Sequence, residues 1–232
     1  MKKRAFDVVV ISLAAIVWVP VVLISALAVL VLSGRPIFYN SRRWVGTDLV
    51  IEMVKLRVMV PNAHRVVAPI DAGRFLNTPL DSPLYTPIGR VLDRLGLNEI
   101  PQFIHVFKGE MSIVGARPLT QAVREALVEQ HEDLDARWLT PAGLTGLPQL
   151  VGRHGLTDHQ RLHLEAAYAR RTSEHPSLRL DFLVLLYTVL ITFGLKKPMA
   201  YDDALTLAAG KQTSLQHLRT QSFAATPDVD VA

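Results

Sequence analysis

Cysteine is absent from the 232-residue sequence, which excludes disulfide bonds and metal sites built on thiolates. Aromatic residues make up only 7% of the chain, and no stripe of basic residues interleaved with aromatic ones is present. The sequence therefore gives no support for nucleic acid as a partner. The eight histidines show no spacing typical of a metal site, and there are no internal repeats. The modest net charge of +4 is compatible with attraction to anionic lipids or phosphorylated substrates.

One long hydrophobic run stands near the N-terminus, at residues 8–32, interrupted only by Ser12, Pro20 and Ser25. A bilayer span needs about 20 apolar residues, so this run is long enough to cross a membrane. It is too long for a signal peptide, and no clean cleavage site closes it. The basic residues at positions 2–4 favour a cytoplasmic N-terminus under the positive-inside rule.

Pro20 lies near the middle of this run and leaves two arrangements open. Proline removes a backbone donor and clashes with the preceding turn, so it bends a helix. The run could be a kinked transmembrane helix, or a re-entrant hairpin that dips into one leaflet and returns. On the residues alone, the kinked helix is the simpler interpretation.

The rest of the chain predicts one small, mostly helical α/β domain over residues 37–197, followed by a partly disordered tail at 198–232. Apolar spacing over residues 86–107 is typical of two short helices. A second apolar stretch at 178–194 is shorter than a comfortable span, and it predicts an interfacial helix. A further helix is expected near 202–209.

Five motifs, in order along the chain, resemble those of the bacterial sugar transferases, the monotopic polyprenyl-phosphate phosphoglycosyl transferases. The first precedes the apolar run and the last lies in a Gly- and Pro-rich segment. They are Lys-Arg-Ala-Phe-Asp at 3–7, Lys-Leu-Arg-Val-Met at 55–59, Leu-Asn-Glu-Ile-Pro-Gln at 97–102, Lys-Gly-Glu-Met-Ser-Ile-Val-Gly-Ala-Arg-Pro at 108–118, and Pro-Ala-Gly-Leu-Thr-Gly-Leu-Pro-Gln-Leu-Val-Gly-Arg at 141–153.

The resemblance implies transfer of a sugar-1-phosphate from a nucleotide sugar, usually a UDP-sugar, to polyprenyl (undecaprenyl) phosphate. UMP is released, Mg²⁺ is required, and the reaction is the first membrane step of glycan or exopolysaccharide assembly. The resemblance also implies that residues 1–36 form a re-entrant hairpin broken at Pro20. The catalytic domain would then sit on the cytoplasmic face of the bacterial inner membrane, against membrane lipid, and a homodimer is plausible.

The resemblance further implies where the nucleophile and the metal lie. Family members attack the sugar-bearing phosphate with an Asp that stands beside a Glu, and the matching residues here are Asn98 and Glu99. We expect Glu99, with Asn98, to face Mg²⁺ and the diphosphate. Glu110 is a second candidate metal ligand.

Cationic and amide side chains in the same motifs are candidates for substrate binding. The reaction brings anions together, so positive charge and positioning carry most of the catalysis. Arg117, in a turn, and Arg153, in the Gly-rich segment, suit a bidentate grip on phosphate. Lys55, Arg57 and Gln149 are further candidates for the substrate site.

Three residues depart from the family pattern in ways that bear on catalysis. Asn98 replaces the nucleophilic Asp, and a neutral amide has no carboxylate with which to attack. Asp93 stands where the family usually has Arg, and Glu165 stands where Asp is expected.

Four accounts of Asn98 are open at this level. Glu99 could serve as the nucleophile, Asp93 could supply the lost carboxylate, the chain could be a natural pseudoenzyme, or Asn98 could be an engineered change. Several departures together favour natural divergence. We predict a working transferase, and the alternative is an impaired pseudoenzyme or a membrane-bound interaction protein.

Overall fold

A computed structural model describes residues 2–63, 81–128, 134–152 and 156–209 of the chain. The described part is mostly helical, with two small sheets. In chain order, its helices (α), 3₁₀ helices (η) and strands (β) are α1 (Lys2–Ser33), β1 (Phe38–Trp44), β2 (Val50–Leu56), α2 (Pro87–Arg94), η2 (Leu97–Gln102), α3 (Phe103–Lys108), β3 (Ser112–Val114), α4 (Gln121–Val128), η3 (Leu134–Leu139), β4 (Gly143–Thr145), α5 (Leu147–Val151), α6 (Asp158–Glu174), α7 (Leu178–Thr192) and α8 (Tyr201–Ala209).

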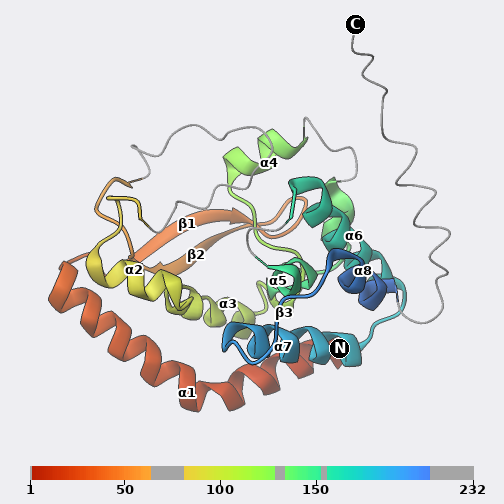
Figure 1. The fold of residues 1–232 in the computed structure, drawn as a ribbon, viewed down its shortest axis with the longest axis horizontal. Helices are drawn as coiled ribbons and strands as arrows, with labels where there is room; N and C mark the ends of the chain where they lie inside the picture. The colour runs from red at the N-terminus through yellow and green to blue at the C-terminus, as the bar shows by residue number, and fades with distance from the viewer. Residues whose placement is uncertain (1, 64–80, 129–133, 153–155, 210–232) are drawn as a thin grey trace, which may run out of the picture.

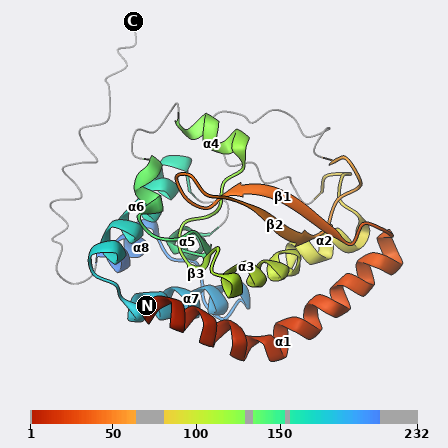
Figure 2. The same ribbon diagram turned by 180° about the vertical axis from the view of Figure 1, so that it is seen from behind.

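The β1–β2 hairpin crosses the middle of the molecule, between α4 on one side and α1, α2 and α3 on the other (Figure 1). Helices α5, α6 and α8 pack together beyond one end of the hairpin, and α7 runs close to the N-terminal half of α1 (Figure 2). The main hydrophobic core joins α1, β2, α3 and α5–α8, with Val114, Leu150, Leu164 and Val184 fully buried, whereas α4 and α2 contribute to two smaller clusters.

The segment that follows residue 197 packs against the rest of the described chain. The helix predicted near 202–209 is confirmed as α8, and its Ala204, Leu205 and Ala208 are buried in the main core. The backbone N–H of Met199 also donates to the carbonyl of Leu150 at 2.8 Å, which ties the segment before α8 to α5. Residues 198–209 are therefore part of the folded unit, and residues 210–232 of the predicted tail lie outside the described residues.

Helix α1 is continuous through Pro20, where the resemblance predicted a break. Both ribbon views show it bent near its middle, with its two ends rising toward the domain (Figures 1 and 2). A proline inside a helix removes one hydrogen bond and bends the axis without necessarily ending the helix. The side chains near the bend are among the most exposed apolar groups of the protein, and they include Leu13, Ile16, Val17, Leu23 and Ile24.

Polar contacts attach the N-terminal end of α1 to the globular domain. Lys3 Nζ lies 2.8 Å from the Asp181 carboxylate and also donates to the carbonyl of Val114 at 3.1 Å. Asp7, 3% exposed, accepts a hydrogen bond from Ser112 Oγ at 2.8 Å. The first motif thus serves to dock the helix against α7 and β3.

The C-terminal end of α1 is attached to the same domain. The guanidinium of Arg57, which is buried, donates to the carbonyls of Ser33 at 2.6 Å, Gly34 at 2.9 Å and Pro36 at 2.6 Å. Such donors satisfy carbonyls that a helix leaves unpaired at its C-terminus. Val29 adds an apolar contact with the core of β2 and α2.

Close backbone approach brings the fourth and fifth motifs together. Strands β3 and β4 pair in parallel, with Ser112 opposite Gly143. A Cβ atom added to Gly143 would lie 2.1 Å from the backbone nitrogen of Gly115, and one added to Gly115 would lie 2.2 Å from the carbonyl oxygen of Pro141. Only glycine permits this approach, which sets Arg117 beside Gly143.

Candidate functional site

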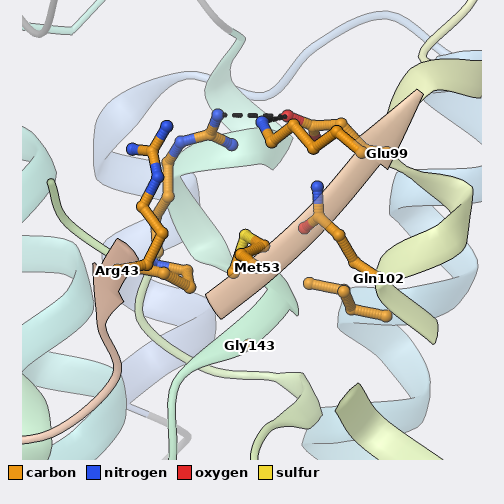
Figure 3. A pocket seen from close by; sticks show the side chains of 9 residues that line it. Arg43, Met53, Glu99, Gln102 and Gly143 are labelled. Atoms are coloured by element: carbon orange, nitrogen blue, oxygen red, sulfur yellow. Dashed lines mark hydrogen bonds and ion pairs between the residues drawn. The ribbon is translucent and has the colours of Figure 1, made fainter. Parts of the chain in front are cut away.

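A small polar pocket opens where the hairpin, η2 and the β3–β4 pair meet (Figure 3). It combines three cationic side chains, one carboxylate, one amide and a few apolar groups. Its lining residues are Arg43, Met53, Lys55, Glu99, Gln102, Arg117, Pro118, Gly143 and Leu144.

The alternation of side chains along the strands explains why three of these residues line the pocket together. Successive side chains of a strand point to opposite faces, so Met53 and Lys55 of β2 share one face with Ile51. The antiparallel register sets Arg43 of β1 opposite Ile51, and cross-strand partners lie on the same face. The hairpin therefore delivers Arg43, Met53 and Lys55 to the pocket from a single face.

The geometry of the 3₁₀ helix η2 explains why two further residues, Glu99 and Gln102, reach the pocket. Such a helix has three residues per turn, so side chains three positions apart lie above one another. Glu99 and Gln102 are three apart, and Figure 3 shows both reaching the pocket from η2. Asn98 is rotated by one third of a turn from Glu99. It is 5% exposed, and it does not line the pocket.

Glu99 is the only acidic residue among the described residues that line the pocket. Its Oε1 lies 2.6 Å from Lys55 Nζ and 3.4 Å from Arg117 Nη2. With Arg43 nearby, three cations face one carboxylate. This excess of positive charge in a partly buried site suits an anionic ligand with more than one negative charge.

The surroundings lower the pKa of two of these cations. Burial is the main cause for Lys55, and the charges of Arg117 and Arg43 add to it, whereas Glu99 acts in the opposite direction. Burial also lowers the pKa of Arg43, together with the charge of Arg117. Bringing an anion into the pocket would relieve this repulsion, because it would supply the negative charge that the cations lack.

A buried ion pair fixes the backbone that carries Arg117. Arg137 and Glu165 lie 2.5 Å apart, and both side chains are 1% exposed. The backbone N–H of Arg117 donates to Glu165 Oε1 at 3.1 Å, and Arg137 donates to the carbonyl of Arg117 at 2.5 Å. Removing either partner of such a buried pair costs about 3–5 kcal/mol. Glu165, one of the departures from the family pattern, thus fixes the turn that carries Arg117.

Asn98 and Asp93 form a hydrogen bond away from the pocket. Asn98 Nδ2 donates to Asp93 Oδ1 at 2.8 Å, and the hydroxyl of Tyr85 donates to Asp93 Oδ2 at 3.1 Å. The pocket lining includes neither Asp93 nor Asn98.

Other predicted site residues lie elsewhere. Arg57 turns its guanidinium to the carbonyls at the end of α1, as described above, so the structure does not bring it to the pocket. Glu110 lies 2.5 Å from His105 Nδ1, and Gln149 is half-buried on α5. Neither Glu110 nor Gln149 lines the pocket. Arg153 lies outside the described residues.

Sequence reasoning missed Arg43 and Met53 as pocket residues. The alternation of side chains along β2 indicates Met53, because it stands two residues before the candidate Lys55 and so shares its face. Arg43 needed the register of the hairpin, which the sequence does not state, because its equally basic neighbour Arg42 faces the other way.

Comparison with known proteins assigns the chain to a family. The profile of the bacterial sugar transferase family matches residues 1–194. The chain belongs to this family. The match confirms the resemblance drawn from the five motifs, and it covers α1, the pocket and α7.

The relatives of this sugar transferase include one of similar length and others that are longer. The exopolysaccharide production protein ExoY of Sinorhizobium fredii is 32% identical over 197 residues, which cover 82% of this chain and 84% of that protein. The UDP-glucose:undecaprenyl-phosphate glucose-1-phosphate transferase of Escherichia coli is 32% identical over 189 residues, covering 79% of this chain and 39% of that protein. The undecaprenyl-phosphate glucose phosphotransferase of Komagataeibacter xylinus is 31% identical, covering 80% and 35%.

The lowered pKa of Lys55 gives a test of its role as the central cation of the pocket. As pH rises through that pKa, Lys55 loses its charge at a lower pH than an ordinary lysine, and binding of an anionic substrate weakens. We expect kcat/KM to fall on the alkaline side below pH 10.5, because kcat/KM reports the free enzyme. In Lys55→Arg the alkaline limb should move to higher pH. The same alkaline limb in both proteins would contradict the assignment.

Proposed function

We propose that this sugar transferase moves a sugar-1-phosphate from a UDP-sugar to polyprenyl (undecaprenyl) phosphate and releases UMP. The observation that carries the proposal is the single carboxylate of Glu99 held among three cations in a family of sugar transferases. Among the relatives reported above, those from Escherichia coli and Komagataeibacter xylinus are named as undecaprenyl-phosphate transferases of sugar phosphate, and that from Sinorhizobium fredii as an exopolysaccharide production protein. A step in exopolysaccharide or glycan assembly fits these names.

Glu99 is the nucleophile in this proposal. One of its carboxylate oxygens attacks the phosphorus that bears the sugar, and the bond from that phosphorus to the bridging oxygen breaks. UMP leaves with the electron pair, and the sugar phosphate remains on Glu99 as an acyl phosphate. An oxygen of polyprenyl phosphate then attacks the same phosphorus, and the Glu99 carboxylate is restored. One phosphoanhydride is broken and one is formed.

Lys55 and Arg117 orient the carboxylate before reaction and hold phosphate oxygens afterwards. In the free protein both cations contact Glu99 Oε1. A diphosphate that enters beside Glu99 supplies new anionic partners to these cations and to Arg43. The negative charge of the phosphate oxygens repels the carboxylate nucleophile, and the three cationic side chains balance that charge. The barrier to attack on phosphorus is lowered as a result.

Among the described lining residues, Glu99 is the one carboxylate that would hold Mg²⁺, together with substrate phosphates that offset the charge of the three cations. The described residues contain no group of three or more His, Asp or Glu side chains placed to hold a metal ion. Mg²⁺ commonly binds through one or two carboxylates together with substrate phosphates and water, so one carboxylate suffices. When bound, the ion would neutralise phosphate charge. Glu110 is engaged with His105, whose Nε2 accepts from the backbone N–H of Val54 at 3.2 Å, and stands apart from this set.

Gln102 is the amide that we assign to substrate binding. It is 5% exposed, and its Nε2 finds no hydrogen-bond partner among the described residues. A buried donor without a partner costs about 1–3 kcal/mol, which an acceptor on a ligand would remove. Since Gln102 lies one turn beyond Glu99 on the same face, a phosphate or sugar oxygen of the donor is the suitable acceptor.

Membrane attachment by a helix that enters and leaves one leaflet is the arrangement we propose for α1. By length and hydropathy alone, the helix could equally span a membrane. Both of its ends contact the same small domain, through Lys3 and Arg57, while apolar side chains near the bend are exposed. A spanning helix would separate its ends by about 30 Å of hydrocarbon. The exposed Phe182, Leu186, Val189 and Phe193 of the α7 region extend the apolar surface.

Release of UMP from a panel of UDP-sugars tests the function, with detergent-solubilised protein, undecaprenyl phosphate and Mg²⁺. Glu99→Gln should lower kcat by about a thousandfold or more, because the amide cannot attack phosphorus. The exposed Glu174→Gln on α6 removes the same charge elsewhere, and it should leave kcat unchanged. Full activity in Glu99→Gln would refute the role of Glu99. A silent parent protein that still binds a UDP-sugar would favour the pseudoenzyme alternative.

The absence of cysteine allows a direct test of the anchor. Single substitutions Lys2→Cys and Arg35→Cys place exposed thiols at the two ends of α1, and Asp203→Cys marks the globular domain. A membrane-impermeant maleimide should label all three from the cytoplasmic side, in inverted vesicles but not in intact spheroplasts. Labelling of the two ends of α1 from opposite sides would show a spanning helix instead.

A further inference from the structure

Asp93 and Asn98 are the acceptor and the donor of one hydrogen bond between their side chains. The Asp93 carboxylate accepts from Asn98 Nδ2 at 2.8 Å through one oxygen and from the hydroxyl of Tyr85 at 3.1 Å through the other. Asn98 is 5% exposed, so water competes little for its amide. A hydrogen bond to an ionised group under these conditions is among the stronger ones in proteins.

A carboxylate at position 98 would not fit this environment. Its oxygen would replace Nδ2 and would face Asp93 Oδ1 at about the same distance, with no proton between them unless one group is neutralised. Two carboxylates this close cannot both be ionised without a large cost. The two departures from the family pattern therefore depend on each other, since Asp93 requires a donor at position 98.

The pair also fixes the direction of Glu99. Asn98 and Asp93 tie η2 to α2 on one side of the 3₁₀ helix. Because successive side chains on such a helix are about 120° apart, a fixed Asn98 determines the direction in which the next residue points. Glu99 is thereby turned toward Lys55 and Arg117.

We propose that Asp93 and Asn98 form one positioning pair that replaces the family's nucleophilic carboxylate at position 98 and holds Glu99 toward the basic pocket. The proposal rests on the proposed function, because it assigns the chemistry to Glu99. It explains Asn98 as part of a site in which a different residue carries the reacting carboxylate, rather than as an inactivating change. Neither residue of the pair lines the pocket.

A cycle of four proteins tests the pair: the parent, Asn98→Asp, Asp93→Asn, and the double exchange. Asn98→Asp should lower Tm by about 4–8 °C at pH 8, because it sets carboxylate against carboxylate. It should also lower kcat about tenfold with little change in KM, because Glu99 is displaced while the cations remain.

The double exchange is the decisive variant. The new amide at position 93 would donate to the new carboxylate at position 98 and accept from Tyr85 through its carbonyl oxygen, so every hydrogen bond of the group is satisfied again. The double variant should return to within about twofold of the parent in kcat and about 2 °C in Tm. Asp203→Asn, an exposed change on α8, is the matched control for loss of one carboxylate and should alter neither quantity.

Two results would overturn the proposal: a parental Tm and kcat in Asn98→Asp, or effects of the two substitutions that simply add in the double variant. Failure of the proposed function is distinguishable from these results, because the parent protein itself would then show no turnover. In that case Tm still measures the coupling of the pair, and the affinity for UDP with Mg²⁺ replaces kcat as the measure of pocket geometry across the four proteins.

Discussion

The ion pair between Lys55 Nζ and Glu99 Oε1, 2.6 Å apart, joins the two elements on which the pocket depends. It ties β2 to η2, and the other side chains of the pocket are arranged around it. The hairpin register adds Arg43, the close approach of Gly115 and Gly143 adds Arg117, and the 3₁₀ geometry adds Gln102. Because three cations surround one carboxylate, the pocket carries a net positive charge. A substrate that brings phosphate oxygens supplies the missing negative charge.

The sequence predicted much of this arrangement because its motifs are local. The mostly helical fold, the long apolar helix, the helices within 86–107 and α8 follow from composition and spacing. Lys55, Glu99 and Arg117 were also found from their motifs, and the structure brings them together although they come from three separate segments. The family match over residues 1–194 has the same origin.

What the sequence could not show is the direction in which individual side chains point. Arg57 lies two residues beyond Lys55, yet it leaves the pocket to bind carbonyls at the end of α1, because β2 ends at Leu56. Asn98 and Glu99 are adjacent, yet one third of a turn on η2 separates a buried positioning residue from a pocket residue. The burial of α8 was hidden for a related reason, since it depends on tertiary packing against α5 and α6.

The central claim is that Glu99, and not Asp93 or Asn98, carries the chemistry. Its most direct test is mass spectrometry of the protein after incubation with a UDP-sugar and Mg²⁺ in the absence of lipid acceptor, followed by fragmentation of the peptide that contains η2. The account predicts a sugar-phosphate adduct on Glu99 that disappears when undecaprenyl phosphate is added. An adduct on Asp93, or turnover with no adduct on any residue under conditions that trap one on a related transferase, would contradict it.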